Sequence, residues 1–157
     1  MVIVAAMFGV VAVAVQEPVV IGLRTAAAAN QREDVRLQMS RALELLTREA
    51  AAAYNVDNST STQFQFDARL TDADADGDAE TLTDINWRVN NGDLERVQGG
   101  TTMVVVPDLT TVAFTYLDSS NNSTNTAANV RVMQMTMTAT RNNEAISMAT
   151  SVRPRNQ

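Results

Sequence analysis

Apolar residues fill the start of the chain without interruption. Residues 1–15 read MVIVAAMFGVVAVAV and contain no polar side chain, and up to Leu23 the only charge is that of Glu17. A helix of this length spans about 22 Å, which is short of the ~30 Å hydrocarbon core of a bilayer. Four interpretations are open: a secretory signal peptide, a transmembrane anchor, the buried stem of an assembled fibre, or a buried core helix.

Residues 24–53 continue this segment with the pattern of an amphipathic helix. They contain neither glycine nor proline, and their apolar residues recur at steps of three and four, which places them on one helical face. The residues of this face are Val35, Met39, Leu43, Leu46 and Ala50. We therefore expect one helix over residues 1–53, with an apolar half at 1–23 and an amphipathic half at 24–53.

Gly9 and Pro18 are the two residues that disfavour a regular helix in the apolar half. Proline inside a helix removes a hydrogen bond and costs about 3 kcal/mol, and glycine costs about 1 kcal/mol relative to alanine. In the assembled form of the protein, we expect the backbone between these two residues to depart from α-helical geometry.

Residues 54–157 change to the period-two alternation of half-buried strands. A polar loop is predicted at Asn55–Thr62 and another at Ser119–Asn129, and Asn90-Asn91-Gly92-Asp93 predicts a tight hairpin. The predicted strands are Phe64–Leu70, Ile85–Val89, Thr101–Val106, Thr110–Leu117, Val130–Thr140 and Ala145–Val152. The expected fold is α+β, a long N-terminal helical stem packed on the mostly antiparallel β-sheet of a globular head, residues 54–157.

Two groups of large side chains are assigned to the core of this head. Met133, Met135 and Met137 alternate along one predicted strand, and this spacing favours core filling over a metal or redox site. Trp87 is assigned to the contact between sheet and helix together with the nearby aromatic residues.

The composition removes most kinds of chemistry. Histidine and cysteine are absent, and all twelve basic residues are arginine. Disulfides, thiol nucleophiles, imidazole acid–base catalysis and Schiff-base lysines are therefore excluded, and we expect no enzyme. Residues 1–53 carry five acids and five arginines, whereas residues 54–157 carry thirteen acids and seven arginines, which is the whole net charge of −6. An acidic head is not expected to bind nucleic acid.

The densest charged motif is an acidic segment between two predicted strands. Asp72, Asp74, Asp76 and Asp78 alternate around Gly77, and Asp84 follows. Alternate carboxylates beside a glycine resemble the first half of an EF-hand loop, so these five aspartates are candidate calcium ligands. Thr83 stands where an EF-hand would place its final glutamate. The competing interpretation is a solvated acidic loop that binds no metal.

Several segments together resemble the type IV pilins and the pseudopilins of type II secretion, in particular the larger minor pilins and minor pseudopilins. MVIVAAMFG is similar to the apolar start of a processed pilin, and Gly9 and Pro18 fall near the glycine and proline that bracket the melted part of the stem in assembled pili. The other similar segments are QMSRALELLTREA, FDARLTDADADGDAETLTDINWRVNNGDLERV and the tail SVRPRN.

The resemblance implies a structural subunit of an extracellular, type IV pilus-like filament or fimbrium at the cell surface. Copies of the chain would assemble through the apolar helix, with Val4, Gly9, Val11 and Pro18 at the assembly face. The inner membrane would hold the helix before assembly, and the pilus or secretion machinery would be a further partner. The alternatives are a minor pseudopilin that primes or caps a type II secretion fibre, and a membrane-anchored calcium-binding module.

One feature of the family has no counterpart in these residues. Family members carry an acidic residue close to their processed N-terminus, which is thought to pair with the N-terminal amine of a neighbouring subunit. The resemblance places Met1 a few residues downstream of that acid, and the nearest acid in this sequence is Glu17. No residue of this sequence therefore inherits that role.

Overall fold

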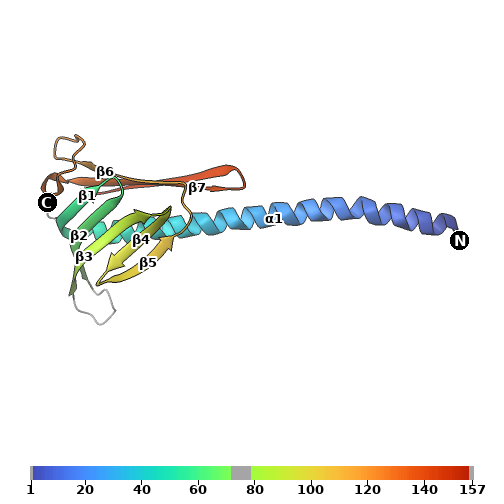
Figure 1. Cartoon of the computed structure of the whole chain (residues 1–157), viewed down its shortest axis with the longest axis horizontal. Helices are drawn as coiled ribbons and strands as arrows, with labels where there is room; N and C mark the ends of the chain where they lie inside the picture. The colour runs from blue at the N-terminus through green and yellow to red at the C-terminus, as the bar shows by residue number, and fades with distance from the viewer. Residues whose placement is uncertain (1, 72–78, 156–157) are drawn as a thin grey trace. The chain divides into compact units, whose positions relative to one another are not determined.

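A computed structural model of the chain describes the backbone of residues 2–71 and 79–155 and the side chains of residues 20–70 and 81–155 (Figure 1). The chain divides into two compact units, residues 1–34 and residues 35–157. The first unit is helical wherever it is described. The second unit contains the end of the same helix and all of the described β-strands.

Helix α1 extends from Val2 to Ala51. Its buried apolar residues lie on the face that the spacing of the sequence predicts, and they are Val35, Met39, Ala42, Leu43, Leu46 and Ala50. At the end of the helix the amide of Ala52 donates to the carbonyl of Glu49 at 3.1 Å. This shorter-range bond tightens the last turn, and the first strand follows at once.

The helix is continuous in the single chain, including the segment between Gly9 and Pro18. The irregular backbone expected there concerns the assembled form, so it stays a prediction. The side chains of Val4, Gly9, Val11 and Pro18 lie outside the described residues. Among the residues whose side chains the structure describes, no helix combines the length and the hydropathy that a membrane span requires.

The strands form two antiparallel sheets. One has five strands in the order β1-β2-β3-β4-β5, and the other has three in the order β6-β7-β8. The bounds are β1 Ala53–Thr60, β2 Gln63–Thr71, β3 Ala79–Asn90, β4 Asp93–Gln98, β5 Thr101–Val106, β6 Thr111–Leu117, β7 Val132–Arg141 and β8 Glu144–Val152. The α+β class and the antiparallel pairing are confirmed.

The expectation of a single sheet is wrong. The break between the two sheets follows Val106, where Pro107 has no amide hydrogen to donate to a ladder and Asp108 has a φ of 53°. The chain therefore turns out of the first sheet at this point. The polar segment predicted at Ser119–Asn129 contains a short 3-10 helix, Ala127–Asn129.

The polar loop predicted at Asn55–Thr62 is also wrong, because most of this segment is strand β1. Its buried residues are Ala53, Val56 and Ser59, a spacing of three that conceals the usual alternation. The cause is two shifts in the register with β2, between Ala53 and Asn55 and between Val56 and Asn58. Such bulges add a residue and re-aim the side chains that follow.

The hairpin predicted at Asn90–Asp93 is confirmed as the connection of β3 to β4. Asn91 and Gly92 have φ values of 52° and 89°, and two positive φ values define the tight turn that matches the twist of paired strands. The amide of Leu109 donates to the carbonyl of Gly92 at 2.7 Å. A Cβ atom on Gly92 would lie 3.1 Å from the carbonyl oxygen of Leu109, so a side chain at this position would crowd the backbone of Leu109.

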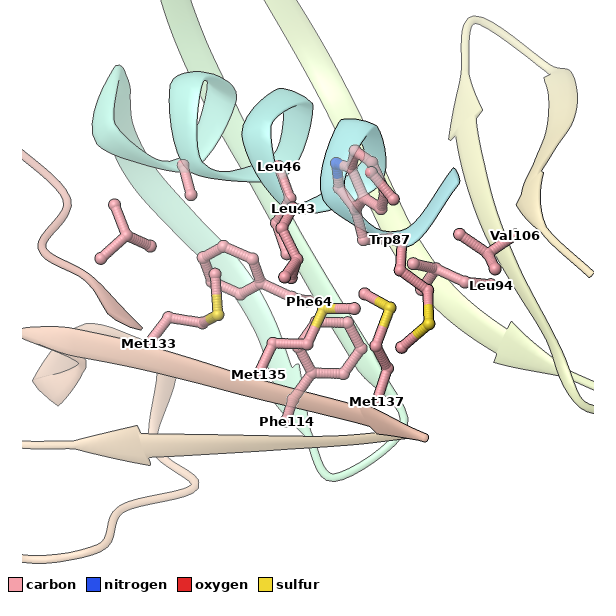
Figure 2. Close-up of a cluster of buried hydrophobic side chains, with 14 of the residues drawn as sticks. Leu43, Leu46, Phe64, Trp87, Leu94, Val106, Phe114, Met133, Met135 and Met137 are labelled. Carbon is pink, nitrogen blue, oxygen red and sulfur yellow. The ribbon is translucent and has the colours of Figure 1, made fainter. Parts of the chain in front are cut away.

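The core lies where α1 packs on the two sheets, and Figure 2 shows its central part. Leu46 from the helix and Trp87 from β3 are fully buried. Met133, Met135 and Met137 extend from β7 toward the helix (Figure 2) and have no exposed surface. Both assignments to the core are therefore confirmed.

Candidate functional site

The acidic motif of the sequence is only partly described. Asp72, Asp74, Asp76 and Asp78 lie outside the described residues. Asp84, the fifth candidate ligand, lies in β3 with a φ of 56°. The assignment of this motif to calcium therefore stays a prediction.

Asp84 belongs to a carboxylate cluster that we define as Asp57, Asp67 and Asp84. One carboxylate oxygen from each residue lies within 4.8 Å of the other two. The three residues come from β1, β2 and β3. Asp57 and Asp84 are exposed, and Asp67 is partly buried. The cluster thus lies on the surface of the five-stranded sheet.

Irregularities in the strand register bring these carboxylates together. Asp57 is the extra residue in the shift between Val56 and Asn58 of β1. Asp67 lies at a second shift, where the pairing of β2 with β3 moves between Phe66 and Ala68. Bulges of this kind re-aim side chains locally, which is why residues that are ten and seventeen positions apart converge. Sequence alternation alone does not locate a bulge, so neither Asp57 nor Asp67 is predicted from the sequence.

Local hydrogen bonds hold the cluster in place. The side-chain amide of Asn55 donates to Oδ1 of Asp57 at 2.7 Å and to Oδ2 of Asp67 at 3.3 Å. The backbone amide of Asp84 donates to Oδ1 of Asp67 at 2.9 Å, and Gln65 donates to Oδ1 of Asp84 at 3.2 Å. All of these donors are neutral, so they orient the carboxylates without cancelling their charge.

The electrostatic result is a raised pKa at one member of the cluster. Partial desolvation raises the pKa of Asp57 above its usual value, and the charges of Asp67 and Asp84 raise it further. The hydrogen bond from Asn55 acts in the opposite direction. Like charges at this separation disfavour the ionised form, so the cluster is a place where a proton or a hard cation would relieve repulsion.

The cluster offers the oxygen ligands that a hard cation prefers, but fewer residues than a complete calcium site usually has. Calcium takes six to eight oxygen ligands at 2.3–2.6 Å, and three carboxylates provide up to six oxygens if all bind through both atoms. Exposed acidic groups are common in proteins that bind no ion. Asp84 is the one residue shared by this cluster and the motif predicted from the sequence.

A second polar group lies between the last turn of α1 and the first sheet. Glu49 is 2% exposed and accepts a hydrogen bond of 2.9 Å from the indole Nε1 of Trp87. The guanidinium of Arg96 forms a salt bridge of 2.7 Å with Oε1 of the same carboxylate. The hydroxyls of Thr47 and Thr150 lie 3.2 Å apart, which links the helix to β8. These contacts fix the end of α1 against both sheets and suggest no chemistry.

Exposed apolar side chains mark the remaining candidate surfaces. In unit 1 they are Val20, Ile21 and Leu23, with exposed fractions of 45%, 63% and 67%. In the second unit Leu37 of α1, Tyr54 of β1, and Met103 and Val104 of β5 are exposed. Large apolar side chains that remain exposed together indicate surfaces that a partner covers.

No protein-family model matches the chain, and no curated protein matches its sequence.

Proposed function

We propose that the protein is a structural subunit of an extracellular, type IV pilus-like filament that assembles through its apolar N-terminal helix. The observation that supports this most directly concerns α1. The helix continues unbroken from Val2 to Ala51, but its described side chains become buried only from Val35 onward. The apolar part of the helix, residues 1–23, therefore needs contacts with other molecules to bury its side chains.

The exposed residues of this part show why a cover is needed. Val20 is nearly half exposed, and Ile21 and Leu23 are more than half exposed. The sequence before these residues is almost entirely apolar. Burial of one such side chain is worth about 1.5–3 kcal/mol. Helices of neighbouring copies provide this burial in a filament, and the inner membrane provides it before assembly.

The second unit has the properties of the outer part of such a subunit. It carries an excess of acids over arginines, thirteen against seven in residues 54–157. The face of β6, β7 and β8 that points away from the core presents threonine, serine, alanine and glutamine, with Leu117 and Val132 at one end, and no charged residue. A hydrated, non-basic exterior is suited to a fibre in contact with water.

An alternative from the same family is a minor pseudopilin that primes or caps a type II secretion fibre. The two functions share the stem and differ in what the head contacts and in how many copies assemble. Long filaments composed of this chain alone support the structural subunit. Short complexes in which this chain is one of several different proteins support the alternative.

The deciding experiment changes the stem and leaves the head intact. Val11→Asp introduces a charge into the apolar helix, and Thr136→Asp introduces the same charge at an exposed position of β7 as a matched control. An unpaired charge buried between helices costs several kcal/mol, so Val11→Asp should abolish filaments seen by electron microscopy of the cell surface, while Thr136→Asp should not. Immunoblots of membrane fractions verify that both variants accumulate. Normal filaments from Val11→Asp would overturn the proposal.

A further inference from the structure

Strand β5 forms a free edge of the five-stranded sheet. The order β1-β2-β3-β4-β5 gives it one strand neighbour, β4, among the described residues, and Figure 1 shows it at the border of the sheet beside β4. The backbone groups on its other side have no ladder partner in that sheet. An edge of this kind is a template for another strand.

The side chains of β5 are exposed on both of its faces. Four successive residues, from Thr101 to Val104, are exposed. Met103 and Val104 have exposed fractions of 45% and 49%, and they point to opposite faces because they are neighbours in a strand. Tyr54, in β1, is the other large apolar side chain that is exposed on the described parts of the strands. Exposed apolar surface on strands is thus concentrated at this edge.

Charged residues and proline, which usually protect an edge strand, are missing from β5. Its sequence, TTMVVV, contains no charged residue and no proline, and β-branched residues favour the extended conformation. The one shift in its register with β4 lies between Leu94 and Glu95, so Thr101–Val104 pair regularly. Natural monomers blunt such an edge with lysine, proline, a bulge or a covering loop.

We infer that β5 pairs in antiparallel orientation with β5 of a second copy of this chain. Charge favours this orientation. A parallel pair would bring the two copies of Asp108 to the same end of the new ladder, and the side chain of Asp108 is 82% exposed and has only a long salt bridge, 3.9 Å, to Arg141. The antiparallel pair instead places each Asp108 beside residues 98–100 of the other copy, which are uncharged. The head as a whole is acidic, so an edge strand without charge lets two heads approach with less repulsion than an acidic surface would.

Symmetry fixes what this contact looks like. In an antiparallel pair, residues that lie directly opposite each other point to the same face of the sheet. When two identical strands pair in this way around a two-fold axis, one residue lies directly opposite its own copy, and the axis passes midway between the two. Met103 and Val104, near the centre of β5, are the two residues that can lie opposite their own copies. In either register, both side chains lie beside the strand of the second copy. A two-fold contact closes with two copies and does not continue into a chain. The contact therefore joins two heads, and it does not require the assembly of the N-terminal helices.

The absence of cysteine makes the contact directly testable. Self-paired residues have Cα atoms about 4.5–5.5 Å apart, within the range that a disulfide bridges. Met103→Cys, Val104→Cys and the control Thr136→Cys would each be introduced into the full chain in mild detergent and oxidised. We expect most of the protein to form disulfide-linked dimers for Met103→Cys or Val104→Cys, and little for Thr136→Cys, which is also exposed but lies on β7. Equal cross-linking of all three variants would overturn the inference, as would cross-linking only to a different protein.

A lysine at the edge provides an independent measurement without a cross-link. Val104→Lys places two like charges in the paired ladder, whereas Thr136→Lys adds the same charge elsewhere. The detergent-corrected mass from analytical ultracentrifugation should fall from dimer to monomer for Val104→Lys only. A dimer that persists in Val104→Lys would show that copies meet through another surface. Val11→Asp, which tests the filament, should leave the cross-link at β5 unchanged.

Discussion

The indole nitrogen of Trp87 donates a hydrogen bond of 2.9 Å to the carboxylate of Glu49. This bond connects β3 with the last turn of α1 across 38 positions of sequence. Arg96, on the neighbouring strand, supplies the opposite charge at 2.7 Å. A buried carboxylate is tolerated only when it is paired and hydrogen-bonded, and here the partners come from two strands.

Removing this carboxylate should destabilise the head strongly. Glu49→Ala leaves Arg96 without its partner in a largely buried position, and breaking one side of a buried pair costs about 3–5 kcal/mol. Glu44→Ala, at an exposed position of the same helix, is the matched control and should change the free energy of unfolding by less than about 0.5 kcal/mol. Urea unfolding of the full chain in detergent measures both, with fluorescence of Trp87, the single tryptophan, as the signal. Equal stability of the two variants would contradict the role of the pair.

Truncation of a side chain on the buried face of α1 should lower the stability of the protein more than truncation of a side chain on its exposed face. Leu46 is fully buried and Leu37 is 49% exposed. Leu46→Ala should therefore lower the free energy of unfolding by about 2–5 kcal/mol, and Leu37→Ala by less than about 1 kcal/mol. The same urea titration provides the numbers. A larger loss for Leu37→Ala would mean that α1 packs on the sheets through a different face.

The carboxylate cluster should give the head a distinctive response to pH. Because the folded pKa of Asp57 is raised, the folded state takes up a proton before the unfolded state does as the pH falls. The contribution of Asp57 to stability therefore increases between neutral pH and its ordinary pKa, as repulsion is relieved. Asp57→Asn should raise the free energy of unfolding at pH 7 and remove part of this increase. Urea titrations from pH 7 to pH 4 measure it, and a variant less stable than the wild type at pH 7 would contradict the assignment.

Glu95 should act in the opposite direction and at a more acidic pH. Hydrogen bonds from Asn90 and Arg88 lower its pKa, with donor distances of 2.9 and 2.7 Å. Stability from these bonds is present above the unfolded pKa and is lost as the pH falls through the folded pKa. In urea titrations at decreasing pH, the free energy of unfolding of Glu95→Gln should therefore fall less steeply at acidic pH than that of the wild type. An unchanged pH dependence would mean that Glu95 does not contribute to the loss of stability in acid.

Calcium should stabilise the head if the acidic motif binds it. A metal that binds only the folded state adds about 2.7 kcal/mol at a hundredfold excess over its dissociation constant. The melting temperature of the full chain in detergent would be compared in millimolar calcium and in chelator, with Asp74→Asn/Asp76→Asn and Asp67→Asn as separate variants. Loss of the shift in the first variant assigns the ion to the predicted motif, and loss in the second assigns it to the carboxylate cluster. Coincident melting curves for the wild type would exclude a calcium site.

The sequence predicts the regular parts of the fold because those parts obey simple periods. Val35, Met39 and Leu46 are buried as their spacing requires, and the hairpin at Asn91 and Gly92 forms because few other residues tolerate two positive φ values. Strand β1 is missed because bulges replace its alternation by a spacing of three.

The same bulges explain why the sequence predicts the candidate site only in part. Asp84 is predicted because it follows a dense acidic run in the sequence. Asp57 and Asp67 join it through register shifts on two different strand pairs, and nothing in their local sequence distinguishes them from other surface aspartates. The pairing of Glu49 with Arg96 is likewise a product of tertiary packing, since 47 positions separate the two residues.

The connectivity of the strands has a consequence for how the head folds. Every ladder in both sheets joins strands that are consecutive in the sequence, so each hairpin closes a short loop at a small cost in chain entropy. The contact of Thr47 with Thr150, by contrast, spans 103 positions. Proteins dominated by local contacts fold faster than those that depend on distant ones. We therefore expect the hairpins to form early. The docking of the helix beside β8 should then complete the head and limit its rate of folding.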